Sequence, residues 1–164
     1  MLFHKNKTPV PPKGLKLIQL FTFVEIPVGQ IADGALHWGE ADWWPGSGLL
    51  EYSKTTGGDA GLGTRYRFKL DGFLAPAGAS EVTQYEPRQV MERTFRGGFF
   101  AGYELLQISE RANGTRVDYE MHYRVVGFVQ TLLWNLFYKK KYVRAIELLL
   151  DALKQHIVKH YYHA

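Results

Sequence analysis

The fold is decided by the stretch TRVDYEMHYRV at residues 115–125, together with the apolar segment that follows it. Apolar and aromatic side chains alternate along this stretch with charged or polar ones, starting with Arg116 and Val117. Successive side chains of a strand point to opposite faces of its sheet. The stretch therefore predicts a β-strand with one buried face and one solvent face, and His122 falls on the solvent face.

A long amphipathic helix is predicted to follow this strand, from about Gly127 to about Tyr162. Its first half is unusually aromatic, and apolar residues recur along it at helical spacing. These residues are Leu132, Leu136, Val143, Ile146, Leu150, Leu153 and Ile157. We expect this stripe to cover one face of a sheet.

The rest of the chain supplies further strands for that sheet. Segments rich in β-forming residues and bounded by turn signals lie at 17–26, 49–54, 64–71, 79–85, 89–96 and 99–110. Between the first two, the proline-free segment 30–44 ends at WWPG, which predicts two short helices. The expected class is α+β with an antiparallel sheet.

Two turn signals predict how the last strands pair. Residues 97–98 (GG) and 113–114 (NG) are expected to form two-residue hairpin loops, because they tolerate positive φ. Counting outward from these loops places Glu104 opposite Tyr123 and brings Arg93 to a position diagonal to Glu104. Arg93, Glu104 and Tyr123 should therefore lie together on the apolar inner face.

An arginine and a glutamate on such a face allow two interpretations. They form a structural ion pair, at a desolvation cost that their attraction only partly offsets, or they are the polar handle of an otherwise apolar ligand pocket. In the second interpretation, Arg93, Glu104 and Tyr123 form the handle. The candidate residues of the pocket wall are Tyr66, Phe68, Phe95, Phe100, Leu106, Tyr119, Met121 and Tyr123, and those near the lid are Phe128, Leu132 and Trp134.

Composition limits the domain organisation and the location. The chain has 164 residues, of which 46% are hydrophobic and 15% aromatic, and no low-complexity segment or linker divides it. We therefore expect one domain at 17–164 after a flexible segment at 1–16. It has no cysteine, no signal-peptide pattern and no apolar run long enough to span a bilayer. These features predict a cytoplasmic protein.

Charge and chemistry limit the partners. The net charge is +4, but the three lysines at 139–141 splay around a helix, which predicts a solvated surface and no nucleic-acid partner. His156, His160 and His163 share a helical face that permits a metal, yet no acidic ligand lies in the same turn. The chain has no Ser-His-Asp order and no nucleophile elbow. We predict no metal, no cofactor and no assigned catalytic residue.

The order of several short motifs resembles a known superfamily. These motifs are VEIPV at 24–28, WP at 44–45, GT at 63–64, YEP at 85–87, NGTRV at 113–117 and the closing helix. Together they resemble the START-like (SRPBCC) superfamily, which includes birch-pollen-allergen relatives and the polyketide cyclase/dehydrase and lipid transport group. The resemblance implies a helix-grip fold: a curved antiparallel sheet of about six to seven strands, two short helices and a long C-terminal helix over an internal hydrophobic cavity.

This resemblance implies less about function than about fold, because superfamily members bind lipids, sterols, quinones or polyketides and a minority are enzymes. The leading hypothesis is noncatalytic binding or transport of a hydrophobic small molecule. One alternative is a cyclase-like or dehydratase-like enzyme, in which Glu104 or Arg93 with Tyr123 would handle a proton. Another is contact with a protein or a membrane surface through the aromatic and basic start of the last helix. The ligand and the oligomeric state stay open.

Overall fold

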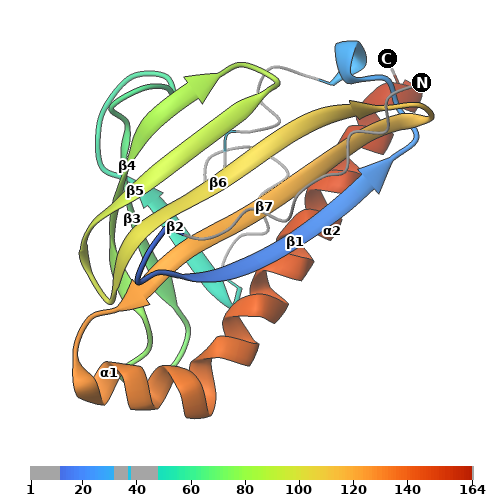
Figure 1. Ribbon diagram of the computed structural model, residues 1–164. Coiled ribbons are helices and arrows are strands. Elements are labelled where there is room, and N and C mark those ends of the chain that lie inside the picture. The colour runs from blue at the N-terminus through green and yellow to red at the C-terminus, as the bar shows by residue number, and fades with distance from the viewer. Residues whose placement is uncertain (1–11, 32–36, 38–47, 164) are drawn as a thin grey trace.

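The computed structural model describes residues 12–31, 37 and 48–163. One seven-stranded antiparallel sheet, in the order β1-β7-β6-β5-β4-β3-β2, curls around a long C-terminal helix (Figure 1). The strands are β1 (Lys16–Val24), β2 (Leu50–Lys54), β3 (Arg65–Leu70), β4 (Ala77–Glu86), β5 (Val90–Gly98), β6 (Phe100–Arg111) and β7 (Gly114–Val125). The helices are the 3-10 helix η1 (Val28–Gln30), α1 (Phe128–Leu133), the π-helix η3 (Trp134–Tyr138) and α2 (Lys139–His163).

The alternation of side chains is as predicted on β3 and β7. Tyr66 and Leu70 on β3 and Val117, Tyr119 and Met121 on β7 are all at most 1% exposed. Their inward faces meet the buried stripe of α2, which includes Tyr142, Ala145, Ile146, Leu149, Leu150, Leu153 and Ile157. The core therefore lies between the sheet and α2, and the site described below is built from its inward-facing residues.

The pairing of β6 with β7 differs from the predicted register. Glu104 lies opposite Met121 rather than Tyr123, because Arg111 pairs with Gly114 and residues 112–113 form the loop. A Cβ at Gly114 would lie 2.2 Å from the carbonyl oxygen of Val24, so this glycine permits the close approach of the end of β1 instead of forming the turn. The shift is even, so the inner and outer faces stay as predicted.

The pairing of β5 with β6 also differs from the predicted register by two residues. Residues 97–98 were expected to form the hairpin loop, but they belong to β5 and pair with β4 at Ala79 and Gly78. A Cβ at Gly98 would lie 2.4 Å from the carbonyl oxygen of Ala77, which explains the glycine. As a result Arg93 lies directly opposite Glu104, closer than the diagonal position predicted.

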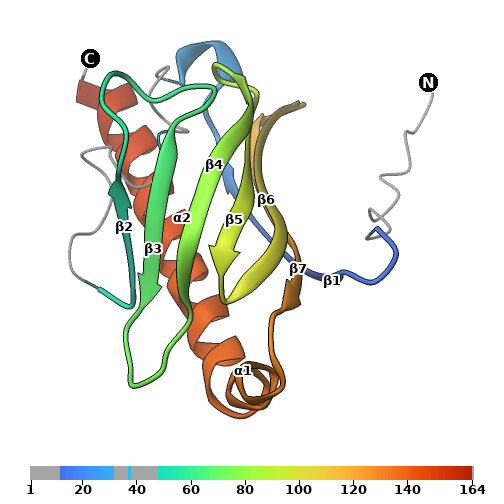
Figure 2. The ribbon, with the colours of Figure 1, turned by 90° about the vertical axis from the view of Figure 1, so that its left-hand side faces the viewer.

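The closing helix begins and ends where predicted but changes direction at its π-helical turn. Figure 2 shows α1 nearly end-on at one end of the molecule, whereas α2 runs along the sheet. An extra residue in a π-turn shifts the phase of the helix. Trp134 is consequently buried, whereas Leu132 and Leu136 are 51% and 63% exposed, so the predicted stripe is wrong in its first half.

Several predictions concern residues outside the described ranges. The two short helices expected at 30–44 fall mostly there, and so does most of the N-terminal segment at 1–16. Among the helices of the described residues, none is long and apolar enough to cross a membrane.

Candidate functional site

The centre of the inner face holds a buried ion pair. Arg93 on β5 and Glu104 on β6 face each other across neighbouring strands. Arg93 Nη2 lies 2.9 Å from Glu104 Oε1, and the two side chains are 3% and 2% exposed. The alternation of both strands points these charged residues inward, and the two charges therefore neutralise each other in an apolar interior.

Tyrosine hydroxyls complete the coordination of the carboxylate. Tyr52 on β2 donates to Glu104 Oε1 at 3.0 Å and to Oε2 at 3.2 Å. Tyr119 on β7 donates to Glu104 Oε2 at 2.9 Å, and its oxygen lies 2.9 Å from the hydroxyl of Tyr142 on α2. Because the single hydroxyl hydrogen of Tyr119 points to Glu104, Tyr142 is the donor to Tyr119. A hydrogen-bond chain thus runs from Tyr142 on α2 through Tyr119 on β7 to Glu104.

The guanidinium of Arg93 lies between two aromatic rings. Its Cζ is 4.5 Å from the ring centroid of Tyr52 and 5.1 Å from that of Tyr66. Burial alone would lower the pKa of Arg93, but the Glu104 carboxylate and the surrounding tyrosine oxygens outweigh this and raise it. Arg93 is therefore held in its charged form. We call Tyr52, Arg93, Glu104, Tyr119 and Tyr142 the polar centre.

Burial also affects the tyrosines of the polar centre. It is the main cause that raises the pKa of Tyr119 well above its ordinary value, and the nearby Glu104 carboxylate adds to the effect. Burial likewise raises the pKa of Tyr142. Both hydroxyls are therefore firmly protonated donors near neutral pH.

Tyr123 is not part of the polar centre, contrary to the prediction. The register shift places it opposite Gly102, and its hydroxyl accepts a hydrogen bond from Trp134 Nε1 at 3.1 Å. Burial raises the pKa of Tyr123, and the Trp134 hydrogen bond lowers it in part. Its role in the structure is to anchor the π-helical turn to β7.

Aromatic residues predicted for the cavity wall pack against one another in a cluster. Phe68, Phe95 and Phe100 lie with ring centroids 5.5 to 6.0 Å apart, and Phe100 meets Trp134 edge-on at 5.0 Å. Such edge-to-face and offset contacts are favourable for aromatic pairs. Of the other candidate residues, Tyr66, Leu106, Tyr119 and Met121 are buried on the same face, whereas Phe128 and Leu132 are exposed.

The space beside the ion pair is small. A cavity of about 10 Å³ is lined by Met91, Arg93, Glu104, Leu105, Leu106 and Tyr119. That volume is at the lower limit for one water molecule. Ser80, which lies on β4 between Tyr66 and Phe95, is 1% exposed, and its hydroxyl has no hydrogen-bond partner within the described part of the chain.

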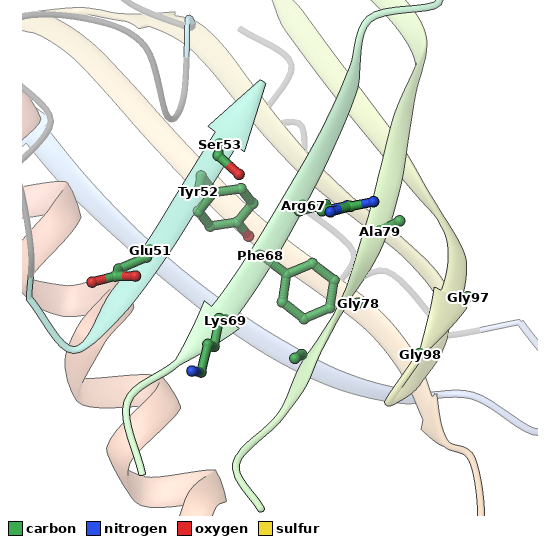
Figure 3. Close-up of a pocket in the computed structure, with 11 residues that line it drawn as sticks. Glu51, Tyr52, Ser53, Arg67, Phe68, Lys69, Gly78, Ala79, Gly97 and Gly98 are labelled. Carbon is green, nitrogen blue, oxygen red and sulfur yellow. The ribbon is translucent and has the colours of Figure 1, made fainter. Parts of the chain in front are cut away.

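A larger pocket lies on the other side of the sheet. It has a volume of about 810 Å³ and is formed by β2, β3, β4 and the end of β5 (Figure 3). Most of its side chains occupy outward positions, such as Ser53, Arg67 and Ala79, and its floor includes Gly78 and Gly97. The sheet therefore lies between this pocket and most of the polar centre, while Tyr52 belongs to both. Among the predicted ligand-binding residues, Phe68 lines it.

His122 lies on the outer face as predicted but is not in solvent. It is 3% exposed, its ring stacks on that of Tyr103 at 4.7 Å, and its Nε2 lies 2.9 Å from Glu120 Oε2. The neighbouring aromatic side chain, which alternation does not reveal, covers the imidazole. Near the C-terminus, the rings of His156 and His160 lie 4.2 Å apart. No metal-binding group of three His, Cys, Asp or Glu side chains occurs within residues 12–31, 37 and 48–163.

Sequence reasoning missed three residues of this interior: Tyr52, Ser80 and Tyr142. Tyr52 occupies an inward position of a predicted strand, so its alternation with Glu51 was a usable signal. Tyr142 precedes the buried residues Ile146 and Leu149 at helical spacing, which was also usable. For Ser80 we see no signal in the sequence.

Comparisons with known proteins bear on the fold. No family model matches the chain, and no curated protein matches it. Among solved structures, the chain is similar to the KanY protein (TM-score 0.64, 14% identity, 88% of this chain and 98% of that chain). It is also similar to norcoclaurine synthase from Thalictrum flavum (0.61, 15%, 89% and 88%) and to Ara h 8.0201 (0.53, 9%, 89% and 99%).

At these identities the likeness concerns the fold alone. The chain has the helix-grip fold that its motifs predicted. The activity of any one of these proteins does not follow from that likeness.

Proposed function

We propose that the protein binds a hydrophobic small molecule, such as a lipid, a quinone or a polyketide-like compound, inside the helix-grip fold and carries it without chemical change. The observation that carries this proposal is the buried ion pair of Arg93 and Glu104 within an aromatic interior. Two buried charges are costly for stability alone, whereas they suit recognition of a polar group on an apolar ligand. The absence of cysteine is compatible with a cytoplasmic carrier.

Apolar burial would supply most of the binding free energy, at about 25 cal/mol per Å² of ligand surface. The polar centre and the Ser80 hydroxyl would orient the ligand. Since the cavity beside the pair holds about one water, a ligand group that contacts the pair would displace side chains lining that cavity, such as Met91 or Leu106. Norcoclaurine synthase, which shares the fold, has been captured with dopamine and hydroxybenzaldehyde, and this supports a small-molecule ligand.

Native mass spectrometry of the purified protein, followed by extraction in organic solvent, tests the proposal directly. We expect a stoichiometric adduct that is released as a lipid, quinone or polyketide-like compound. A bare protein mass, together with no binding of palmitate, ubiquinone analogues or flavonoids added to the protein, would contradict it.

A matched pair of double variants then locates the ligand. The variant Arg93→Leu with Glu104→Leu removes the interior pair, whereas Arg65→Leu with Glu81→Leu removes an exposed cross-strand pair of the same chemistry, joined at 3.0 Å. We expect ligand occupancy to fall only in the interior variant. Equal occupancy in two folded variants would place the ligand elsewhere.

A second candidate function is a cyclase-like or dehydratase-like enzyme, and the hydrogen-bond chain from Tyr142 through Tyr119 to Glu104 favours it. Such a chain could move a proton to or from a bound carbonyl compound. The residue that takes the role earlier assigned to Tyr123 is Tyr119. Incubation with a linear poly-β-ketone and detection of a product lacking one water, lost on Tyr119→Phe, would support the enzyme over the carrier.

A further inference from the structure

Helix α1 and the π-helical turn expose an unusual amount of apolar surface. Phe128, Leu132, Leu136 and Phe137 are 85%, 51%, 63% and 65% exposed. No residue of α1 is buried, so this helix adds little to the core. Monomeric proteins rarely expose contiguous apolar patches of this kind unless the patch binds something.

The loop between β3 and β4 extends the same surface. Phe73 and Leu74 in this loop are 86% and 62% exposed. The loop is held against the helix, because the Tyr138 hydroxyl donates to the carbonyl of Phe73 and Lys141 Nζ lies 3.0 Å from Asp71 Oδ2. Figure 2 shows the loop and α1 at the same end of the molecule. We call Phe73, Leu74, Phe128, Leu132, Leu136 and Phe137 the apolar tip.

The charges around the apolar tip are nearly all positive. Lys139 and Lys140 are exposed directly after the π-helical turn, and Lys141 follows them. No Asp or Glu occurs in the sequence between Glu120 and Glu147. Asp71, the acidic residue of the adjoining loop, is already bound to Lys141. The apolar tip is therefore bordered by cations that could meet anionic groups.

We propose that the apolar tip docks the protein onto a membrane surface that contains anionic lipids. Aromatic and aliphatic side chains on a helix that lies in the interfacial plane enter the boundary between head groups and acyl chains, while adjacent lysines contact anionic head groups. An apolar protein partner would account for the exposed rings but not for the lysines that border them. A neutral bilayer leaves those lysines equally unexplained. The inference does not depend on the interior ligand.

Cosedimentation with vesicles tests this docking. The probes are vesicles of phosphatidylcholine alone and of equimolar phosphatidylcholine and phosphatidylglycerol, at low and at high salt. We expect binding to the anionic vesicles, weakened but not abolished by high salt, because salt screens the lysines and leaves the inserted rings in place. Replacing Lys139 and Lys140 with Gln should lower the partition coefficient about tenfold or more.

A matched pair of double variants separates the apolar tip from general stickiness. Phe128→Ser with Leu136→Ser changes the apolar tip, and Phe21→Ser with Leu62→Ser makes the same substitutions at side chains that are 60% and 74% exposed elsewhere. We expect the first variant to lose binding at high salt and the second to bind as the unmodified protein does. Circular dichroism melting checks that both are folded.

Three results would overturn the proposal. The first is no binding of the unmodified protein to anionic vesicles at low salt. The second is equal binding by the two double variants. The third is a dimer in solution that the Phe128→Ser, Leu136→Ser variant dissolves and that anionic vesicles do not dissociate, since the apolar tip would then be covered by a second copy of the chain.

Discussion

The polar centre and the apolar tip each hold side chains in an environment that disfavours them. At the polar centre, Arg93 and Glu104 are buried, but the chain itself supplies their partners from β2, β7 and the paired strands. At the apolar tip, Phe73 and Phe128 remain 86% and 85% exposed. The difference indicates that the chain supplies partners for the buried charges, at a desolvation cost that these partners only partly offset, whereas the apolar tip is completed by something outside the chain.

The comparison is most severely tested by removing one charge of the polar centre. Arg93→Leu should lower the free energy of unfolding by about 3–5 kcal/mol, because it leaves the Glu104 carboxylate buried without its cation. Chemical denaturation measures this loss. The double variant Arg93→Leu with Glu104→Leu should be more stable than Arg93→Leu alone. If the double variant loses the sum of the two single losses, the pair is not a coupled unit.

Removing one hydroxyl of the polar centre should have a smaller effect. Tyr119→Phe deletes a hydrogen bond to a charged carboxylate and the acceptor of Tyr142, so we expect a loss of about 1.5–3 kcal/mol by the same measurement. Tyr162→Phe is the control, since Tyr162 is 72% exposed. Equal stability of the two variants would show that the chain from Tyr142 to Glu104 contributes nothing.

The buried tyrosines should also make stability fall at alkaline pH. Burial raises the pKa of Tyr119 well above 10.0, its ordinary value, so above about pH 10 the unfolded state loses this proton while the folded state keeps it. Each such group then lowers the free energy of unfolding by about 1.4 kcal/mol per pH unit until the folded pKa is reached. Denaturation over a pH series should show a shallower decline for Tyr119→Phe than for Tyr162→Phe. Parallel declines would contradict the assignment.

The faces of the sheet could be predicted from the sequence because they depend on a period of two. Val117 and Tyr119 turned inward as expected, and Arg93 and Glu104 met inside even though the register was wrong. An even slip preserves every face, so the burial pattern could not reveal it. Gly114 misled the prediction because it serves the close approach of the end of β1, a contact between residues far apart in sequence.

The membership of the polar centre was less predictable than its charged pair. Tyr142 is in phase with the buried residues Ile146 and Leu149 of α2, so its inward position was a usable signal, although its contact with Tyr119 depends on tertiary packing. The π-helical turn before α2 is harder to anticipate, because helical periodicity assumes a constant phase. The same turn explains why Leu132 and Leu136 lie in the apolar tip instead of the core. Ordinary helical spacing cannot anticipate an inserted residue, so the sequence assigned these leucines to the wrong environment.

The smallest effect on stability is expected from a substitution in the apolar tip. Phe128→Ser should change the free energy of unfolding by no more than about 0.5 kcal/mol, since the ring is 85% exposed and contributes no buried area to lose. Chemical denaturation of this variant, with Phe137→Ser as a second example at 65% exposure, provides the measurement. A loss above about 1 kcal/mol would show that Phe128 packs within the chain in solution. A neutral result would leave its exposed ring without a structural reason inside the protein, and the cause would then have to be sought in what the apolar tip touches.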